Sequence, residues 1–188
     1  MYRRFGKRLV DLLFSAAAII MLSPVLALAA LAVWLDDRHP PFFHQERVGR
    51  HHEPFVIIKF RTMPLDTEHV ASASLQAPEI TRVGRVLRRL SIDELPQMFN
   101  IVRGDMSVVG PRPALASQRE LLALREASGS HHLRPGLTGL AQIRSYDGMP
   151  DAEKARHDHE YADHVTLRGD LAIIAKTVGY LFRPPSIY

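Results

Sequence analysis

A run of 24 uncharged residues, from 12 to 35, follows a basic N-terminal segment and contains Ser23-Pro24 near its centre. A straight helix of that length measures about 36 Å, enough to cross a hydrocarbon core of about 30 Å. Because Pro24 lacks a backbone donor and its ring clashes with the carbonyl of Ile20, the sequence predicts a kink there. The Ser23 hydroxyl is expected to bond the carbonyl of Ile19 and steady the bend. Two arms of about 12 residues, each roughly 18 Å long, reach only about halfway across.

The segment 1–38 has four interpretations. A kinked spanning helix places the basic N-terminus in the cytoplasm and the rest of the chain on the other side. A re-entrant helix enters and leaves by the same face, which keeps both ends in the cytoplasm. A signal peptide fits the basic start and the small residues at 27–29, but the apolar run is long and continues past them. A buried helix of a soluble protein rarely has this length, so spanning and re-entrant forms remain open.

Composition narrows the classes of partner. The 188 residues include no cysteine, which excludes disulfides and thiolate chemistry. A net charge of +4 suits anionic lipid headgroups and phosphorylated ligands. We expect no nucleic acid partner, because the sequence has no recognition motif and only 7% aromatic residues. Trp34 and Phe42-Phe43 flank the exit of the apolar run, where aromatic anchors of a membrane interface are expected.

The remaining residues, 39–188, have the pattern of a compact α+β domain that is predominantly helical with a few short strands. Residues 55–60 are β-branched and aromatic, and they predict a strand. Residues 64–78 are polar and rich in small residues, and they predict a mobile loop or a poorly ordered helix. Helices are predicted from hydrophobic periodicity and capping signals over 79–90, 91–102, 117–129, 151–165 and 169–182.

The predicted helix 79–90 is basic and amphipathic. Its apolar side chains fall on one face, at Val83, Val86, Leu87 and Leu90, and arginines cover the rest. One interpretation is an interfacial helix whose apolar face lies at the acyl boundary of a membrane. The other is a core-facing helix with a solvated basic face.

Charged side chains suited to phosphate chemistry gather in the middle of the sequence, at Lys59, Arg61, Arg88, Asp93, Glu94, Asp105 and Arg112. Carboxylates with several cations suit phosphoryl transfer, because one carboxylate can attack phosphorus while its neighbour holds Mg²⁺. Arginines bind the non-bridging oxygens. A structural interpretation is also open, since Ser91 and Glu94 form a capping box and Asp93 is a favourable first-turn acid.

Five ordered segments carry a family resemblance: 59–63 (KFRTM), 91–97 (SIDELPQ), Asn100, 104–113 (GDMSVVGPRP) and 134–139 (RPGLTG). Together they closely resemble the bacterial sugar transferases that are monotopic polyprenyl-phosphate phosphoglycosyl transferases. The resemblance covers nearly the whole chain and includes Ser23-Pro24 in the apolar run. It implies a re-entrant helix over 1–38 and a cytoplasmic catalytic domain over 39–188, at the bacterial inner membrane.

The resemblance also implies a reaction. Asp93 would attack the sugar-linked phosphate of a UDP-sugar and release UMP, while Glu94 binds Mg²⁺. Undecaprenyl phosphate or a related polyprenyl phosphate would then take the phosphosugar from Asp93, starting an exopolysaccharide, capsule, O-antigen or glycoprotein glycan. Contacts to phosphate or nucleotide, or structural roles, are implied for Lys59, Arg61, Arg88, Asp105 and Arg112. A homodimer and downstream glycosyltransferases are further expected partners.

Some segments depart from the family pattern. After residues 134–139 the family commonly has Trp, then Ala-Gln and Asn-Gly, whereas this chain has LAQIRSY over 140–146. The family's sugar or nucleotide recognition by this loop therefore does not carry over. Tyr161 and Asp170 match later family positions loosely. His157, His159 and His164 are expected on a solvated helix face and not at a metal, because two of them diverge on a helix.

Two functions of another class remain open. A catalytically weak homologue could act as a membrane-bound scaffold for later glycosyltransferases, although intact Asp93 and Glu94 argue against it. An electrostatic membrane tether could use the basic face of residues 82–89, which predicts salt-sensitive lipid binding without turnover.

Overall fold

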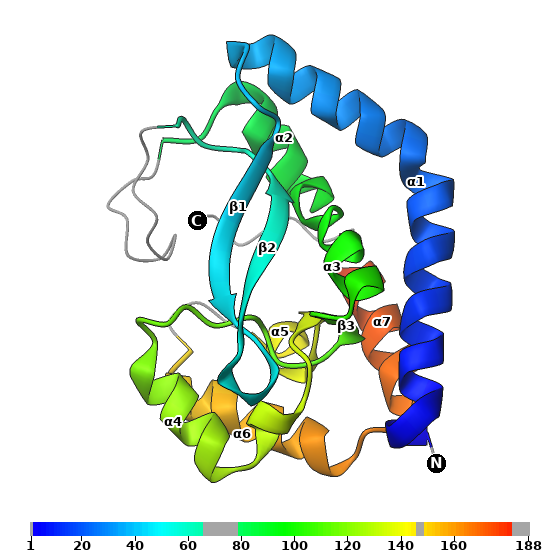
Figure 1. Cartoon of the computed structure of the whole chain (residues 1–188), viewed down its shortest axis with the longest axis vertical. Helices are drawn as coiled ribbons and strands as arrows, with labels where there is room; N and C mark the ends of the chain where they lie inside the picture. Colours follow the sequence, from blue (N-terminus) through cyan, green and yellow to red (C-terminus); the bar gives the residue numbers. More distant parts are fainter. Residues whose placement is uncertain (1, 66–78, 146–148, 182–188) are drawn as a thin grey trace.

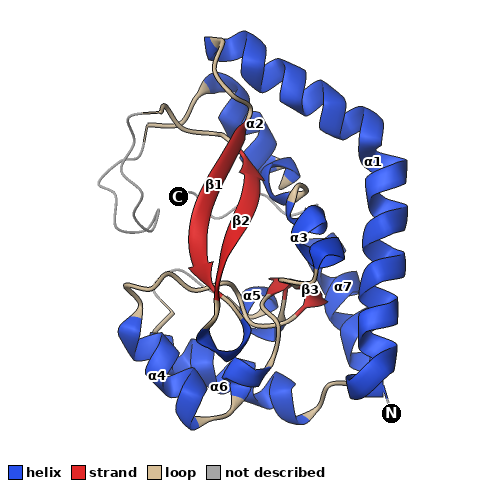
Figure 2. Ribbon diagram, in the orientation of Figure 1, coloured by secondary structure: helices blue, strands red, loops and turns tan. Residues whose placement is uncertain are grey.

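The computed structural model describes residues 2–65, 79–145 and 149–181 and is mostly helical (Figures 1 and 2). The predicted loop 64–78 lies almost wholly outside the described residues. The α-helices are α1 (Lys7–Asp37), α2 (Arg82–Arg89), α3 (Gln97–Arg103), α4 (Arg119–Ala127), α5 (Leu140–Ile143), α6 (Asp151–Asp163) and α7 (Leu167–Leu181). Single turns form η1 (Tyr2–Gly6), η2 (Arg50–His52), η4 (Ile92–Glu94) and η5 (Ser130–His132). The strands are β1 (Phe42–Val48), β2 (Pro54–Phe60), β3 (Ser107–Val109) and β4 (Gly136–Thr138).

The N-terminal helix α1 is continuous over 31 residues, with Pro24 near its middle. Figure 1 shows its axis bending about midway, as expected where a proline removes a donor and crowds the preceding turn. The predicted kink is therefore confirmed, and helical structure continues through Ser23-Pro24. The Ser23 hydroxyl donates to the carbonyl of Ile20 at 2.8 Å, and not to that of Ile19.

Both ends of α1 are fastened to the rest of the chain. Near its start, Lys7 pairs with Asp170 of α7 at 2.8 Å, and Asp11 accepts a bond from the backbone of β3. At its other end, Asp37 forms a two-point ion pair with Arg61, just after β2. Between the two attachments large apolar side chains are exposed, among them Ile20, Met21 and Leu28.

Strands β1 and β2 form an antiparallel hairpin, in register from Phe42 opposite Phe60 to Val48 opposite Pro54. Strand β2 confirms the predicted strand at 55–60. The buried Asn100 of α3 attaches to β2, because its side chain accepts from the Ile58 amide at 3.0 Å and donates to the Val56 carbonyl at 2.7 Å. The hairpin is thereby held against α3.

Strands β3 and β4 form a short parallel pair. Gly110 directly follows β3 and Gly136 begins β4. The two backbones are so close there that a Cβ on either glycine would collide with the backbone opposite. These glycines belong to the sequence segments 104–113 and 134–139, which explains physically why each segment has glycine there. The main core surrounds this pair and includes Ile101, Met106, Val109, Tyr161 and Ile173.

Several predicted helix ends are wrong. The helix predicted from residue 79 begins at Arg82, because the Thr81 hydroxyl caps it by accepting from the Gly84 amide at 2.9 Å. Ser117 is no cap, and α4 begins at Arg119. Helix α6 follows the prediction closely. Helix α7 begins at Leu167, and the predicted end at Phe182 lies outside the described residues.

The apolar residues of α2 do not share one environment. Leu87 is buried against Ala29 and Val33 of α1, whereas Val86 is 57% exposed and Leu90 is 51% exposed. One side of α2 therefore faces a core and the other presents exposed apolar side chains beside α1, while the interfacial interpretation stays a prediction.

Candidate active site

The acidic pair lies on a single 3₁₀ turn, η4, and not in the first turn of a long helix. Ser91 adopts a left-handed conformation (φ 53°) and makes no capping hydrogen bond, so the predicted capping box is wrong. The helix from 91 to 102 is divided because Pro96 has no amide to continue the backbone bonds.

Glu94 is the centre of a charge cluster. Its Oε1 accepts from Lys59 Nζ of β2 at 2.6 Å and from Arg112 Nη2 at 3.3 Å. The Glu94 side chain is 24% exposed, and burial by itself raises its pKa. Lys59 and then Arg112 outweigh that effect and hold the pKa of Glu94 at about 2. Glu94 is therefore ionised at neutral pH and closes no capping box.

Asp93 has a different environment from its neighbour. Its pKa is raised by burial and by the adjacent negative charge of Glu94, although Lys59 and Arg88 oppose the shift. Within the described ranges no side-chain cation pairs directly with its carboxylate. A partly desolvated carboxylate without a direct counter-ion is a stronger nucleophile than a solvated one.

A polar cleft opens beside Glu94. It is lined by Arg47 of β1, Lys59 of β2, Gln97 of α3, Arg112, and Gly136 and Leu137 of β4. Two buried donors there, Arg47 Nε and Gln97 Nε2, have no hydrogen-bond partner in the structure as described. An unpaired buried donor costs about 1–3 kcal/mol, so an oxyanion that accepts these bonds is favoured. Burial and then Arg112 lower the pKa of Arg47 to about 10, which leaves it charged at neutral pH.

Of the predicted site residues, Lys59, Glu94 and Arg112 line the cleft, whereas Asp93, Arg61, Arg88 and Asp105 do not. Arg88 is near the acidic pair and donates from Nε to the Thr62 hydroxyl at 2.9 Å. Arg61 is buried and binds Asp37, so it fastens the end of α1. Asp105 accepts from Arg103 Nε at 2.6 Å and from Asn100 at 3.3 Å. Arg61 and Asp105 are not among the side chains that line the cleft.

The sequence reasoning missed Arg47, Gln97 and Arg125. Gln97 ends the segment SIDELPQ, which was its only signal. Arg125 is buried in α4 and donates from Nη1 to the Arg112 carbonyl at 3.0 Å, which positions the backbone of a cleft residue. Arg47 lies in a strand that was not predicted, and only the pairing with β2 brings it to the cleft.

The segment that departs from the family pattern begins with a short helix, α5, while Tyr146 lies outside the described residues. Tyr161 and Asp170 are bonded to each other at 2.7 Å in the core, and Asp170 also accepts from Tyr2 at 2.6 Å. These two residues serve the attachment of α1 and do not line the cleft.

The sequence is similar to known proteins over nearly its whole length. A model of the bacterial sugar transferase family matches residues 2–184. The chain belongs to this family. It is 40% identical to the UDP-glucose:undecaprenyl-phosphate glucose-1-phosphate transferase of Caulobacter vibrioides, covering 97% of this chain and 72% of that protein. It is 37% identical to the exopolysaccharide production protein ExoY of Rhizobium meliloti, covering 92% of this chain and 84% of that protein. The Escherichia coli enzyme named like the Caulobacter one is 37% identical, over 93% of this chain and 40% of that protein.

Proposed function

We propose that this bacterial sugar transferase moves a sugar 1-phosphate from a UDP-sugar to undecaprenyl phosphate, with UDP-glucose as the first donor to test. The names of the Caulobacter and Escherichia relatives state this reaction for glucose, and the ExoY name supports a role in exopolysaccharide production. The observation that carries the proposal is the acidic pair on η4. One carboxylate there is ion-paired and fully ionised, and its neighbour is partly desolvated with a raised pKa.

The reaction has two displacement steps at one phosphorus. An Asp93 carboxylate oxygen bonds to the phosphorus that bears the sugar, the bond to the bridging oxygen breaks, and its electron pair leaves with UMP. An oxygen of undecaprenyl phosphate then bonds to the same phosphorus, and the bond to Asp93 breaks. The products are UMP and undecaprenyl-diphosphate-sugar, and the Asp93 carboxylate is regenerated.

The cleft supplies positive charge for the diphosphate. Lys59 and Arg112 both contact one oxygen of Glu94, and Arg47 and Gln97 hold unpaired donors nearby. We expect these groups to bind phosphoryl oxygens when the donor enters, so that charge developing on the leaving UMP is stabilised. Arg88 acts on Asp93 and helps to keep its carboxylate ionised.

Mg²⁺ fits this donor set, because the ion prefers carboxylate and phosphate oxygens and usually has only one or two protein carboxylates. Glu94 is the residue that would hold it, with Asp93 as its neighbour. When bound, Mg²⁺ would spread the negative charge of the diphosphate oxygens. The low pKa of Glu94 keeps that carboxylate available as a ligand at every physiological pH.

The attachment of α1 supports a re-entrant, monotopic placement at the inner membrane. Its start contacts α7 and its end contacts the residues after β2, so both ends are bound to the same folded unit. A spanning helix about 46 Å long would place these ends on opposite sides of the bilayer. Exposed apolar side chains of α2 and α3, namely Val86, Leu90, Phe99 and Val102, extend the proposed membrane face next to α1.

The proposed reaction is tested by UMP release. The detergent-purified chain is incubated with Mg²⁺, undecaprenyl phosphate and either UDP-glucose or UDP-galactose. We expect UMP from one donor, loss of activity in Asp93→Asn, and full activity in the control Asp163→Asn, an exposed carboxylate of α6. Release of UDP would contradict the mechanism. Lipid binding without turnover would instead favour the scaffold or the tether.

The topology has its own test, because the chain contains no cysteine of its own. Single cysteines at the exposed positions Arg3 and Asp36 are probed with a membrane-impermeant maleimide in sealed vesicles of known orientation. We expect both to react from the cytoplasmic face. Reaction from opposite faces would indicate a spanning helix and refute the monotopic placement.

A further inference from the structure

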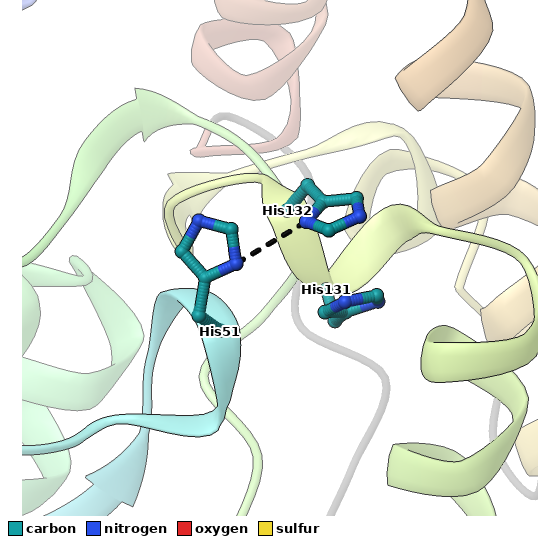
Figure 3. Close-up of side chains that lie close together, drawn as sticks. All are labelled: His51, His131 and His132. Atoms are coloured by element: carbon teal, nitrogen blue, oxygen red, sulfur yellow. Dashed lines mark hydrogen bonds between the residues drawn. The ribbon is translucent and has the colours of Figure 1, made fainter.

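Four histidines from two separate turns gather at the end of the β1–β2 hairpin that lies farthest from α2. His51 and His52 belong to η2 within the hairpin loop, and His131 and His132 belong to η5; Figure 3 shows His51, His131 and His132. The rings of His131 and His132 have centroids 3.9 Å apart, and those of His51 and His132 are 5.0 Å apart. Neither turn lines the cleft beside Glu94.

The nitrogen positions suit a metal ion. One ring nitrogen from each of His51, His131 and His132 lies within 4.8 Å of the other two. The Nδ1 atoms of His51 and His132 are 3.2 Å apart and face each other (Figure 3). Two imidazoles that bind Zn²⁺ tetrahedrally, with Zn–N distances of about 2.05 Å, have nitrogens about 3.3 Å apart. The observed separation fits two ligands of one ion, and it equally fits the hydrogen bond that joins the two rings when no ion is bound.

The hairpin turn adopts an unfavourable backbone conformation in order to present His51. The Glu53 amide donates to the Arg50 carbonyl at 3.1 Å, and His51 and His52 between them have φ of 57° and 65°. Two consecutive positive φ values define a type I′ turn, for which Asn-Gly is the favoured pair. A side chain with a Cβ in this conformation costs about 1–2 kcal/mol per residue. Strain of this kind persists where the surroundings or a function require the residue.

The second turn is held in a fixed position relative to the first. Arg50 Nε donates to the His132 carbonyl at 2.8 Å, which joins the hairpin loop directly to η5. His131 and His52 line a common pocket, where His52 Nε2 is buried without a partner among the described residues. The ligands are thus presented by a joined backbone and would need little rearrangement to bind an ion.

We propose that His51, His131 and His132 form a binding site for a borderline transition-metal ion, with Zn²⁺ the best fit. Three neutral imidazoles suit Zn²⁺, and neither Mg²⁺ nor Ca²⁺ is expected, because those ions require oxygen ligands. Water or a small anion completes the coordination. The site is separate from the Mg²⁺ proposed at Glu94, and the inference does not depend on the proposed reaction.

A metal ion there would fasten the hairpin to the segment that leads into β4. The hairpin carries Arg47 and Lys59, and β4 supplies Gly136 and Leu137, so both bound segments continue to the cleft. The ion would therefore act as a structural clamp behind the cleft. Its effect should be visible as thermal stability, independently of turnover.

The test uses the full chain in detergent, without a histidine tag and after chelator treatment. Zn²⁺ binding is measured by competition with a chromophoric chelator, and thermal unfolding is followed with and without Zn²⁺. We expect one Zn²⁺ per chain and a rise in Tm of roughly 5–10 °C at a free concentration about 100-fold above the Kd. Mg²⁺ at the same concentration should not displace Zn²⁺ from the chain, because the three imidazoles are poor ligands for it.

Two variants in the same turn provide the matched comparison. His51→Asn removes a ligand but suits the type I′ turn, so it should fold normally and bind Zn²⁺ more than about 100-fold more weakly. His52→Gly relieves the same backbone strain but keeps all three ligands, so it should retain binding and the rise in Tm. Equal Zn²⁺ affinity in both variants, or no binding by the parent chain, would overturn the proposal and leave only a hydrogen-bonded pair of rings.

Discussion

Arg125 of α4 and Asp158 of α6 form a buried ion pair beneath the cleft, and removal of one partner has a calculable consequence. Arg125 is 7% exposed and Asp158 is 2% exposed. The guanidinium contacts Oδ2 of Asp158 at 2.8 Å from Nε and 2.7 Å from Nη2. Burial raises the pKa of Asp158, and Arg125 is the main group that opposes the shift. Arg125→Met therefore leaves a buried carboxylate with no cation to stabilise it.

Breaking a buried pair by removing one partner costs about 3–5 kcal/mol. In a chain of this length 1 kcal/mol corresponds to roughly 2–4 °C in Tm, so Arg125→Met should lower Tm by about 6–20 °C. The loss should be smaller at acidic pH, because Asp158 can then take up a proton and lose its uncompensated charge. The double variant Arg125→Met, Asp158→Leu removes both charges, and its Tm should return to within a few degrees of the parent.

Thermal unfolding in detergent, followed by circular dichroism at 222 nm, measures these changes. Arg156→Met, which removes an exposed arginine from α6, is the control and should shift Tm by less than about 2 °C. A decrease in Tm of less than about 4 °C in Arg125→Met would refute the argument. A double variant whose Tm is no higher than that of Arg125→Met would refute it too. The stable double variant should still bind UDP-sugar more weakly, because it lacks the bond from Arg125 to the Arg112 carbonyl.

Three further predictions concern the cleft and the strand pair. At low pH, kcat/KM should fall with a pKa above the ordinary aspartate value of about 3.9. The reason is that the pKa of Asp93 is raised and its ionised carboxylate is the form that reacts. Arg88→Gln should move that fall to higher pH, and a shift to lower pH would contradict this assignment. Gly136→Ala should abolish stable folding, because the added Cβ would collide with the backbone of Gly110. The control Gly179→Ala should fold, because the space around Gly179 is open. Thermal unfolding of the two variants distinguishes these outcomes. Arg47→Met should raise KM for the UDP-sugar in the UMP assay, and an unchanged KM would exclude Arg47 from donor binding.

The sequence predicted well wherever the signal was local. The β-branched residues 55–60 indicated β2, and Pro24 indicated the bend of α1. Strand β1 was missed because its sequence, FFHQERV, is half polar, and it becomes a strand by pairing with β2. The Ser91 capping box was wrong because Pro96, five residues later, cannot continue the backbone bonds of the helix.

The candidate site also depends on contacts between segments that are distant in the sequence. The family motifs pointed to Asp93 and Glu94, but the contact of Glu94 with Lys59 joins residues 35 apart and depends on the docking of β2 beside η4. The histidine cluster joins two turns 81 residues apart in sequence. No periodicity or spacing rule relates such segments, so only the folded chain brings them together.

The attachment of α1 also has a consequence for the order of assembly. Tyr2 bonds to Asp170, which is synthesised 168 residues later. The start of α1 can contact α3 and β3, through Arg8 and Asp11, once those elements have been made, but its bonds to Asp170 must wait for α7. The bonds from Tyr2 and Lys7 to Asp170 therefore complete the attachment of α1 after its contacts with α3 and β3 have become possible.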